Sequence, residues 1–334
     1  MDRKEFAQAV KEGKIGGAYL FEGPEENIKA AALTQLRKAL LPEGLEELNE
    51  TVLDAPATDA LIAATETLPF LADKRLVVVR EHPALTGRGE GDDRLKEYIA
   101  HVPETAVLVF LVRGKADARK KLYTAIKKHG CIVSFNPLGD EELNDWIRRS
   151  FAKQGKECSA RTASMLAFTV GGGTALMKQE IDKLAALAGE RTTITEDDVR
   201  QVATRSIECT VFEMVDAVVA RQEGRAFGLL RDMLTAGEQR LGILAMLLRQ
   251  YRLLQHVKIM QYEKKSPQEI KSSLGVAPFA AERCIRQAAA YTGGEVRQAV
   301  DICLTTEMNV KSGEYNDEGA LESAMLRLFA LKRK

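Results

Sequence analysis

The 334-residue sequence has little of what marks a secreted, metal-bound or membrane-spanning protein. It contains one tryptophan, four histidines and five cysteines, and the cysteines lie far apart with no CxxC pair. A disulfide framework or a zinc site is therefore not expected. No stretch approaches the roughly 18 uninterrupted apolar residues of a membrane span, and charges interrupt the amino-terminal segment throughout. We expect a reduced, cytoplasmic protein with no membrane partner.

An excess of charge of one sign is also missing. Lys and Arg total 48, and Asp and Glu total 48, so the surface as a whole is not cationic. Any affinity for nucleic acid must therefore be local or come from partners. Apolar residues make up 45% of the chain, enough for two or three packed domains.

No catalytic constellation is recognisable. The histidines lie outside the GxSxG, HExxH and HxE…CxxC contexts of hydrolases, metalloproteases and deaminases; they are His82, His101, His129 and His256. Residues 22–27 stand where a phosphate-binding loop would lie, but the Lys and Ser/Thr that GxxxxGK[ST] requires are missing, and Glu25 and Glu26 would repel polyphosphate. We expect no cofactor, no metal and no ATP hydrolysis. An unusual NTPase using the Gly23 loop is one alternative.

The first part of the chain, up to about residue 137, alternates short β-rich runs with helical patterns. Buried strands joined by crossover helices are typical of a mainly parallel α/β sheet. The predicted strands are 18–21, 50–53, 76–79, 106–112 and 131–135, and the predicted helices are 25–41, 57–66, 92–101 and 116–129. Residues 86–91 form a Gly-rich tract that predicts a surface loop.

The rest of the chain is helical in pattern. Gly171–Gly173 falls between two helical patterns, so a helix connection is favoured there over an anion-binding nest. The predicted helices are 141–154, 160–170, 175–188 and 195–204, followed by an apolar helical stripe through 241–254 and helices at 267–274, 278–290, 294–311 and 317–332. The fold class is therefore α/β plus all-α, with domains at 1–139, 140–208 and 209–334.

Residues 67–75 suggest a binding feature. Pro69 has no amide hydrogen and disfavours helix at Leu68, so Phe70 and Leu71 can be presented in a turn as a hydrophobic plug for a partner's pocket. The alternative is that both side chains pack back under the sheet.

Two basic stretches could contact phosphates. The first is opposed only by Glu263 and contains Arg240, Arg249, Arg252, Lys258, Lys264 and Lys265. The second contains Lys115, Arg119, Lys120, Lys121, Lys127 and Lys128. Such residues either neutralise nucleic-acid phosphates or form ordinary solvated faces.

Seven segments in order along the chain resemble the delta subunits of bacterial DNA polymerase III clamp loaders. They are YLFEGPEE (19–26), LPFLADKRLVVV (68–79), VFLV (109–112), FNPL (135–138), VFEMVDAV (211–218), MLLRQYRLL (246–254) and ALESAMLRL (320–328). The resemblance spans nearly the whole chain. It implies an AAA+-like α/β domain without a functional P-loop, a small helical lid domain and a helical collar domain.

The resemblance also implies a function. Members of this family insert a hydrophobic pair into the sliding clamp (beta) to open its ring for loading onto primed DNA, and that pair falls on Phe70 and Leu71, with Leu68 beside them. The collar joins the other loader subunits, gamma/tau and delta prime, and family members contact primed DNA in the assembled complex. We assign possible phosphate contacts to Arg249, Arg252 and Lys258. The family lacks ATPase machinery of its own. A freestanding DNA-binding module is the second alternative.

Overall fold

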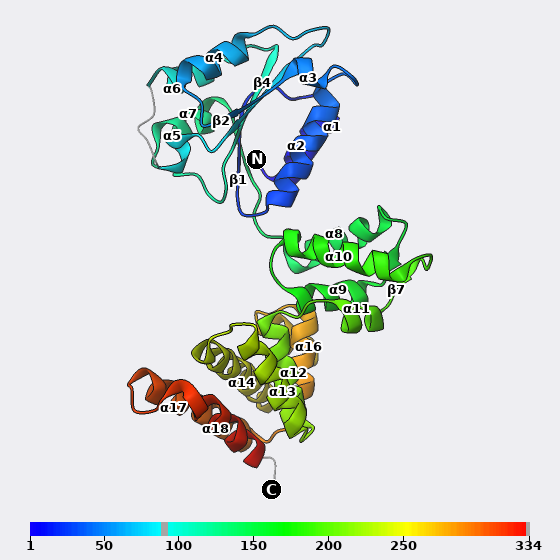
Figure 1. The fold of residues 1–334 in the computed structure, drawn as a ribbon, viewed down its shortest axis with the longest axis vertical. Coiled ribbons are helices and arrows are strands. Elements are labelled where there is room, and N and C mark those ends of the chain that lie inside the picture. Colours follow the sequence, from blue (N-terminus) through cyan, green and yellow to red (C-terminus); the bar gives the residue numbers. More distant parts are fainter. Residues whose placement is uncertain (88–92, 332–334) are drawn as a thin grey trace. The chain divides into compact units, whose positions relative to one another are not determined.

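The computed structural model describes residues 1–87 and 93–331 (Figure 1). The chain divides into two compact units. The first comprises Met1–Pro137 with Gly173–Ala175, and the second comprises Leu138–Gly172 with Leu176–Lys334. Residues 88–91 of the predicted surface loop, and residue 92 of the predicted helix that follows, lie outside the described residues. None of the helices in the described ranges is long and apolar enough to cross a membrane.

The first unit is built on a five-stranded parallel sheet with the order β2-β3-β4-β1-β5. Its strands are β1 (Gly17–Glu22), β2 (Glu50–Asp54), β3 (Arg75–Arg80), β4 (Ala106–Leu111) and β5 (Cys131–Ser134). Apolar side chains of β3 and β4 are buried on both faces, which is why these strands are continuous apolar runs in the sequence. All five predicted strands and the parallel sheet are confirmed.

Helices cover both faces of this sheet (Figure 1). They are α1 (Arg3–Lys11), α2 (Glu26–Leu40), α3 (Glu46–Asn49), α4 (Thr58–Glu66), α5 (Pro83–Thr86), α6 (Asp93–Tyr98) with the 3₁₀ turn η1 (Ile99–His101), and α7 (Lys121–His129). Helices α1 and α2 pack on one face through Phe6 and Leu36. Helices α4, α6 and α7 pack on the other through Leu61, Leu95 and Ile126.

One helix prediction in this unit needs correction, and α1, α3 and α5 were not predicted. The helix predicted over 116–129 begins only at Lys121, because residues 113–120 form the irregular connection from β4. Helix α1 was not predicted, although Asp2 and Glu5 form a reciprocal capping box at its start. The alternating charges of the amino-terminal segment belong to the exposed face of this helix, while Phe6 and Val10 are buried.

The second unit begins with four helices around one apolar cluster. They are α8 (Asp140–Ala152), α9 (Ala160–Val170), α10 (Thr174–Ala188, whose first two residues belong to the first unit) and α11 (Glu196–Val202). Their shared core includes Phe151, Leu166 and Ile181. A short parallel pair, β6 (Glu157–Cys158) with β7 (Thr193–Ile194), was not predicted, since two-residue strands leave no periodicity to detect.

Seven helices follow in the described part of the second unit. They are α12 (Ile207–Val219), α13 (Glu223–Thr235), α14 (Arg240–Tyr262), α15 (Pro267–Ser273), α16 (Pro278–Ala289), α17 (Gly293–Lys311) and α18 (Asp317–Ala330). They share a large apolar cluster that includes Phe212, Leu247 and Met325. The predicted stripe on α14 is buried at Leu244, Leu248, Tyr251 and Leu254.

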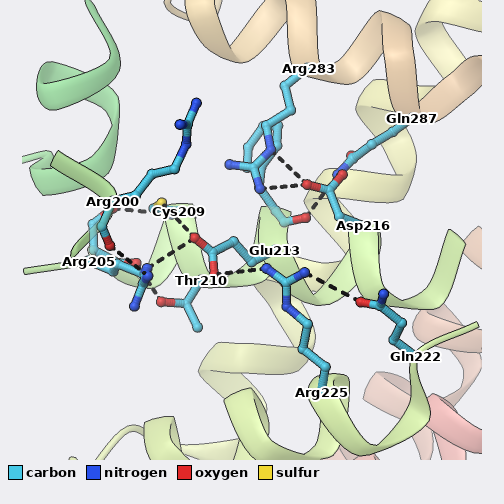
Figure 2. A network of polar contacts seen from close by, with 12 residues as sticks. Arg200, Arg205, Cys209, Thr210, Glu213, Asp216, Gln222, Arg225, Arg283 and Gln287 are labelled. Carbon is cyan, nitrogen blue, oxygen red and sulfur yellow. Dashed lines mark hydrogen bonds and ion pairs between the residues drawn. The ribbon is translucent and has the colours of Figure 1, made fainter. Parts of the chain in front are cut away.

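A partly buried polar network ties three of these helices together. Asp216 on α12 accepts hydrogen bonds from Arg283 at 2.6 and 3.0 Å and from Gln287 at 2.6 Å, both on α16 (Figure 2). Gln250 on α14 donates to the Gln287 Oε1 at 2.7 Å. The Arg283 guanidinium also lies over the ring of Phe212, 5.6 Å from its centroid. The network fixes how α12, α14 and α16 pack.

Candidate functional site

Residues 68–71, which we call the apolar loop, leave α4 and lead toward β3. Leu68 is 75% exposed, Phe70 is 54% exposed and Leu71 is 76% exposed. The alternative prediction, that Phe70 and Leu71 pack under the sheet, is therefore wrong. The structure brings all three apolar side chains to one solvent-exposed turn, where Pro69 prevents α4 from continuing.

Both ends of the apolar loop are fastened to the first unit. On the α4 side, the Thr67 hydroxyl donates to the Ala63 carbonyl at 2.8 Å. On the β3 side, the Lys74 amine donates to the Ile15 carbonyl, and the Arg75 guanidinium donates to the Thr51 hydroxyl at 2.9 Å. The loop is therefore a short turn between fixed points.

The first basic stretch is divided by the structure. Arg249 and Arg252 line one pocket of about 400 Å³ on the face of α14, together with His256 and Glu307. Lys258 does not line it, because six residues at 100° each turn it away from Arg252. Arg249 is already paired with Glu208 at 2.7 Å, and Arg240 lies 3.9 Å from Glu322.

The second basic stretch is also partly ion-paired. Arg119 pairs with Asp117 at 2.9 Å, and its guanidinium lowers the pKa of that carboxyl to about 2. Lys121 pairs with Asp93 at 3.1 Å. A pocket of about 470 Å³ lies here and is lined by basic side chains that include Arg119, Lys121 and Lys128.

The segment at the position of a phosphate-binding loop is closed by its own backbone. The Gly23 N–H donates to the Gly114 carbonyl at 2.5 Å, and the Glu25 N–H donates to the Phe135 carbonyl at 3.3 Å. Gly23 has a φ of 117°, and a Cβ there would collide with the main chain of Phe135. These donors are therefore not directed at a ligand.

The prediction that the lysine of GxxxxGK[ST] is missing was wrong. Lys29 stands six residues after Gly23, the spacing of the lysine in GxxxxGK, while Ile28 and Ala30 replace the second glycine and the hydroxyl residue. Lys29 is only 3% exposed, and its amine donates to the Val112 carbonyl at 2.7 Å and to Glu26 at 2.6 Å. Its ammonium group thus has internal partners.

The glycine run does connect α9 to α10, as predicted, with positive φ angles at Gly171 and Gly172. Within the first unit, which includes Gly173–Ala175, the Glu25 carboxylate accepts hydrogen bonds from the Thr174 N–H at 3.1 Å and from its hydroxyl at 2.5 Å. Glu25 therefore has a structural role as a hydrogen-bond acceptor for Thr174, which was not predicted from the sequence.

The buried histidine and the buried cysteines take packing roles. His82 is buried, its Nδ1 accepts from the Ala84 N–H at 3.2 Å, and burial lowers its pKa. Burial raises the pKa of the Cys284 thiol to about 11 and that of Cys303 to about 12, so neither is a nucleophile at neutral pH. Within residues 1–87 and 93–331, no group of His, Cys, Asp or Glu could hold a metal ion.

The sheet order and the succession of helices define the class of protein: a parallel-sheet α/β domain followed by an all-α region. The family model for the DNA polymerase III delta subunit matches residues 19–136, and the model for its C-terminal domain matches residues 208–328. The chain therefore belongs to the DNA polymerase III delta subunit family, as the sequence resemblance implied.

Individual relatives agree. The chain is 27% identical over 336 residues to DNA polymerase III subunit delta of Bacillus subtilis, which covers 98% of this chain and 97% of the relative. It is 24% identical over 163 residues to a probable DNA polymerase III subunit delta of Aquifex aeolicus, covering 48% of this chain and 47% of the relative. The solved structure of the Bacillus subtilis DNA clamp loader delta protein matches with a TM-score of 0.51 over 98% of this chain and 99% of that one, at 27% identity.

Proposed function

We propose that this chain is the clamp-binding subunit of a bacterial clamp loader and opens, or holds open, the ring-shaped sliding clamp (beta) for loading onto primed DNA. Leu68, Phe70 and Leu71 enter a pocket of the clamp. The exposure of these three apolar side chains in one fastened turn carries the proposal. The delta-subunit family and the clamp-loader relative support it.

The apolar loop offers enough surface for a binding hot spot. Burying about 200 Å² of Phe70 and Leu71 at about 25 cal/mol per Å² contributes about 5 kcal/mol before ordering costs. An apolar anchor of this size seated in a pocket is typical of the residues that dominate protein interfaces.

Ring opening needs no bond-breaking step in this chain. A ligand that binds the open ring more tightly than the closed ring shifts the ring toward the open state by the difference in affinity. ATP binding to other loader subunits would control when the apolar loop is presented, through the position that the collar gives this subunit.

We divide the chain into a clamp-binding domain at 1–139, a lid domain at 140–208 and a collar domain at 209–334. Most buried side chains of the two helical regions belong to two different apolar clusters, which supports the last boundary, although Phe168 of α9 belongs to the second cluster. The collar would join this chain to the gamma/tau and delta prime subunits in the cytoplasm.

Contact with primed DNA is a second part of the proposal. Arg249 and Arg252 share one pocket on α14 and would neutralise backbone phosphates in the assembled loader. Lys258 would contribute from a different face of the same helix. Because Arg249 is paired with Glu208, its contact requires exchange of that partner for a phosphate.

The test is a titration of the full chain against the replicative sliding clamp, beside the Phe70→Ala, Leu71→Ala double variant. A matched control replaces two exposed leucines of the second unit, Leu176→Ala and Leu326→Ala. We expect the parent and the control to bind and the double variant to lose binding. Equal binding by the double variant would contradict the role of the apolar loop. Failure of the parent with the other loader subunits and ATP present would contradict the clamp-binding function and favour a freestanding DNA-binding module.

A further inference from the structure

We propose that Asn49 is the positioning residue of the apolar loop: its side chain holds the main chain of Phe70 so that Phe70 and Leu71 project before a partner arrives. This inference rests on the proposed function, because it concerns how the same loop is prepared for binding. Asn49 ends α3 and lies 21 residues before Phe70 in the sequence.

The contact has two points. The Phe70 N–H donates to the Asn49 Oδ1 at 2.7 Å, and the Asn49 Nδ2 donates to the Phe70 carbonyl at 2.9 Å. A carboxamide pairing with both main-chain groups of one residue reproduces what a neighbouring strand would supply. Only one orientation of the amide satisfies both bonds. Phe70 is therefore held by its backbone, and its ring is left for a partner.

Both protons of the Asn49 side-chain amide are donated in hydrogen bonds. The second proton of Nδ2 is donated to the Leu45 carbonyl at 3.1 Å, within the turn that forms α3. Asn49 itself is 0% exposed. A buried amide without partners is unfavourable, so movement of Phe70 away from Asn49 is opposed by the groups that this movement would leave unpaired.

Leu71 shows that the loop is held against a local cost. Its φ is 51°, a left-handed conformation that is unfavourable for a residue with a Cβ. Such a conformation persists where its surroundings fix it. Here Asn49 fixes the residue before it, and Lys74 fixes the chain three residues later.

The support for Asn49 is itself rigid. The next residue, Glu50, begins β2 and is paired with Arg37 of α2 at 2.6 Å. The Arg75 guanidinium reaches the Thr51 hydroxyl, which links the start of β3 to β2 beside the loop. The apolar loop is thus tied to the sheet through Asn49 rather than by its own side chains. Pre-ordering of this kind lowers the entropy lost on binding.

Kinetics of clamp binding test the role of Asn49 in the full chain. With Asn49→Ala, we expect the association rate with the sliding clamp to fall about tenfold, because the competent loop conformation becomes a minor population. Leu71→Ala, by contrast, should act mainly on the dissociation rate. The matched control is Thr65→Val, which removes another buried hydrogen bond, to the Leu61 carbonyl, at the same level of burial. An unchanged association rate in Asn49→Ala would overturn the inference, as would an equal fall in the control.

Amide hydrogen exchange separates this inference from the proposed function. Without any clamp, the Phe70 amide should exchange at least about tenfold faster in Asn49→Ala than in the parent, and at the parent rate in Thr65→Val. Equal exchange in the parent and Asn49→Ala would overturn the positioning role. If the parent fails to bind the clamp, the proposed function is contradicted, while the exchange of Phe70 still decides whether Asn49 holds the loop.

Discussion

Polar side chains have different roles in the two units. In the first unit, Asn49 is fully buried and serves the main chain of an exposed apolar turn. In the second, Asp216 and Gln287 are used between helices and fix their packing (Figure 2). The first arrangement presents a surface, and the second maintains a framework.

The candidate contact surfaces of the two units differ in the same way. The apolar side chains of the loop already face solvent, so they have few contacts within the chain to give up when a partner binds. On α14, Arg249 already has an acidic partner that a phosphate must displace. Binding by the first surface should therefore be strong and insensitive to salt, whereas binding by the second should be weaker and salt-dependent.

The largest expected effect concerns the apolar loop. Replacing Phe70 and Leu71 together with alanine should weaken clamp binding at least about 100-fold, which corresponds to about 3 kcal/mol. The loss should be similar at low and high salt, because it comes from apolar burial. Fluorescence titration at two salt concentrations measures it, and a loss that disappears at high salt would contradict the apolar character of the contact.

The next effect concerns the framework of the second unit. Asp216→Ala leaves the Arg283 guanidinium, whose side chain is 13% exposed, without its carboxylate. We expect the free energy of unfolding to fall by about 2 kcal/mol, below the cost of a fully buried pair because Asp216 is partly exposed. Denaturant unfolding measures this loss, and clamp affinity should not change. A fall in clamp affinity without a fall in stability would contradict the assignment of Asp216 to the framework rather than to a contact surface.

A smaller effect depends on pH. The Arg191 guanidinium, 2.9 Å away, lowers the pKa of Asp198 from 3.8 to about 2. Because the folded pKa is the lower one, the stabilisation is present above pH 4 and is lost as the pH falls from about 4 to 2. Asp198→Asn should lower the free energy of unfolding by about 1 kcal/mol at pH 7, with the difference closing near pH 2. Unfolding curves from pH 7 to pH 2 measure it; a difference that does not change with pH would contradict the ion pair as its source.

The smallest effect is expected on α14. Replacing Arg249 and Arg252 with alanine should weaken binding of the assembled loader to primed DNA about threefold at moderate salt and reduce the slope of log K against log salt by about 2. Exposed contacts of this kind contribute little each. Anisotropy titration at several salt concentrations measures the slope, and an unchanged slope would remove these arginines from the DNA contact.

The central strands of the first unit could be predicted from the sequence because β1, β3 and β4 are buried on both faces and leave continuous apolar runs, as at residues 76–79. Short elements were missed: α3 has four residues, and β6 and β7 have two each. Elements of this length leave no periodicity, and their formation depends on tertiary contacts.

Only part of the candidate site could be predicted from the sequence. Pro69 before two apolar residues indicated a turn, but exposure of Phe70 depends on where the turn is fastened, which the local sequence does not encode. Asn49 was missed because its partner lies 21 residues away. Arg249 and Lys258 looked equivalent as members of one basic stretch, yet helix geometry places them on different faces of α14. In addition, Arg249 is ion-paired with Glu208.

Site-directed photo-crosslinking tests the central claim most directly. A photoactivatable residue is placed at position 71 of the full chain, and at position 326 as an equally apolar, exposed control in the second unit. With the sliding clamp present, we predict a crosslink from position 71 to a single apolar pocket of the clamp and none from position 326. Retained clamp binding with no crosslink from position 71 would contradict the claim that the apolar loop enters the clamp.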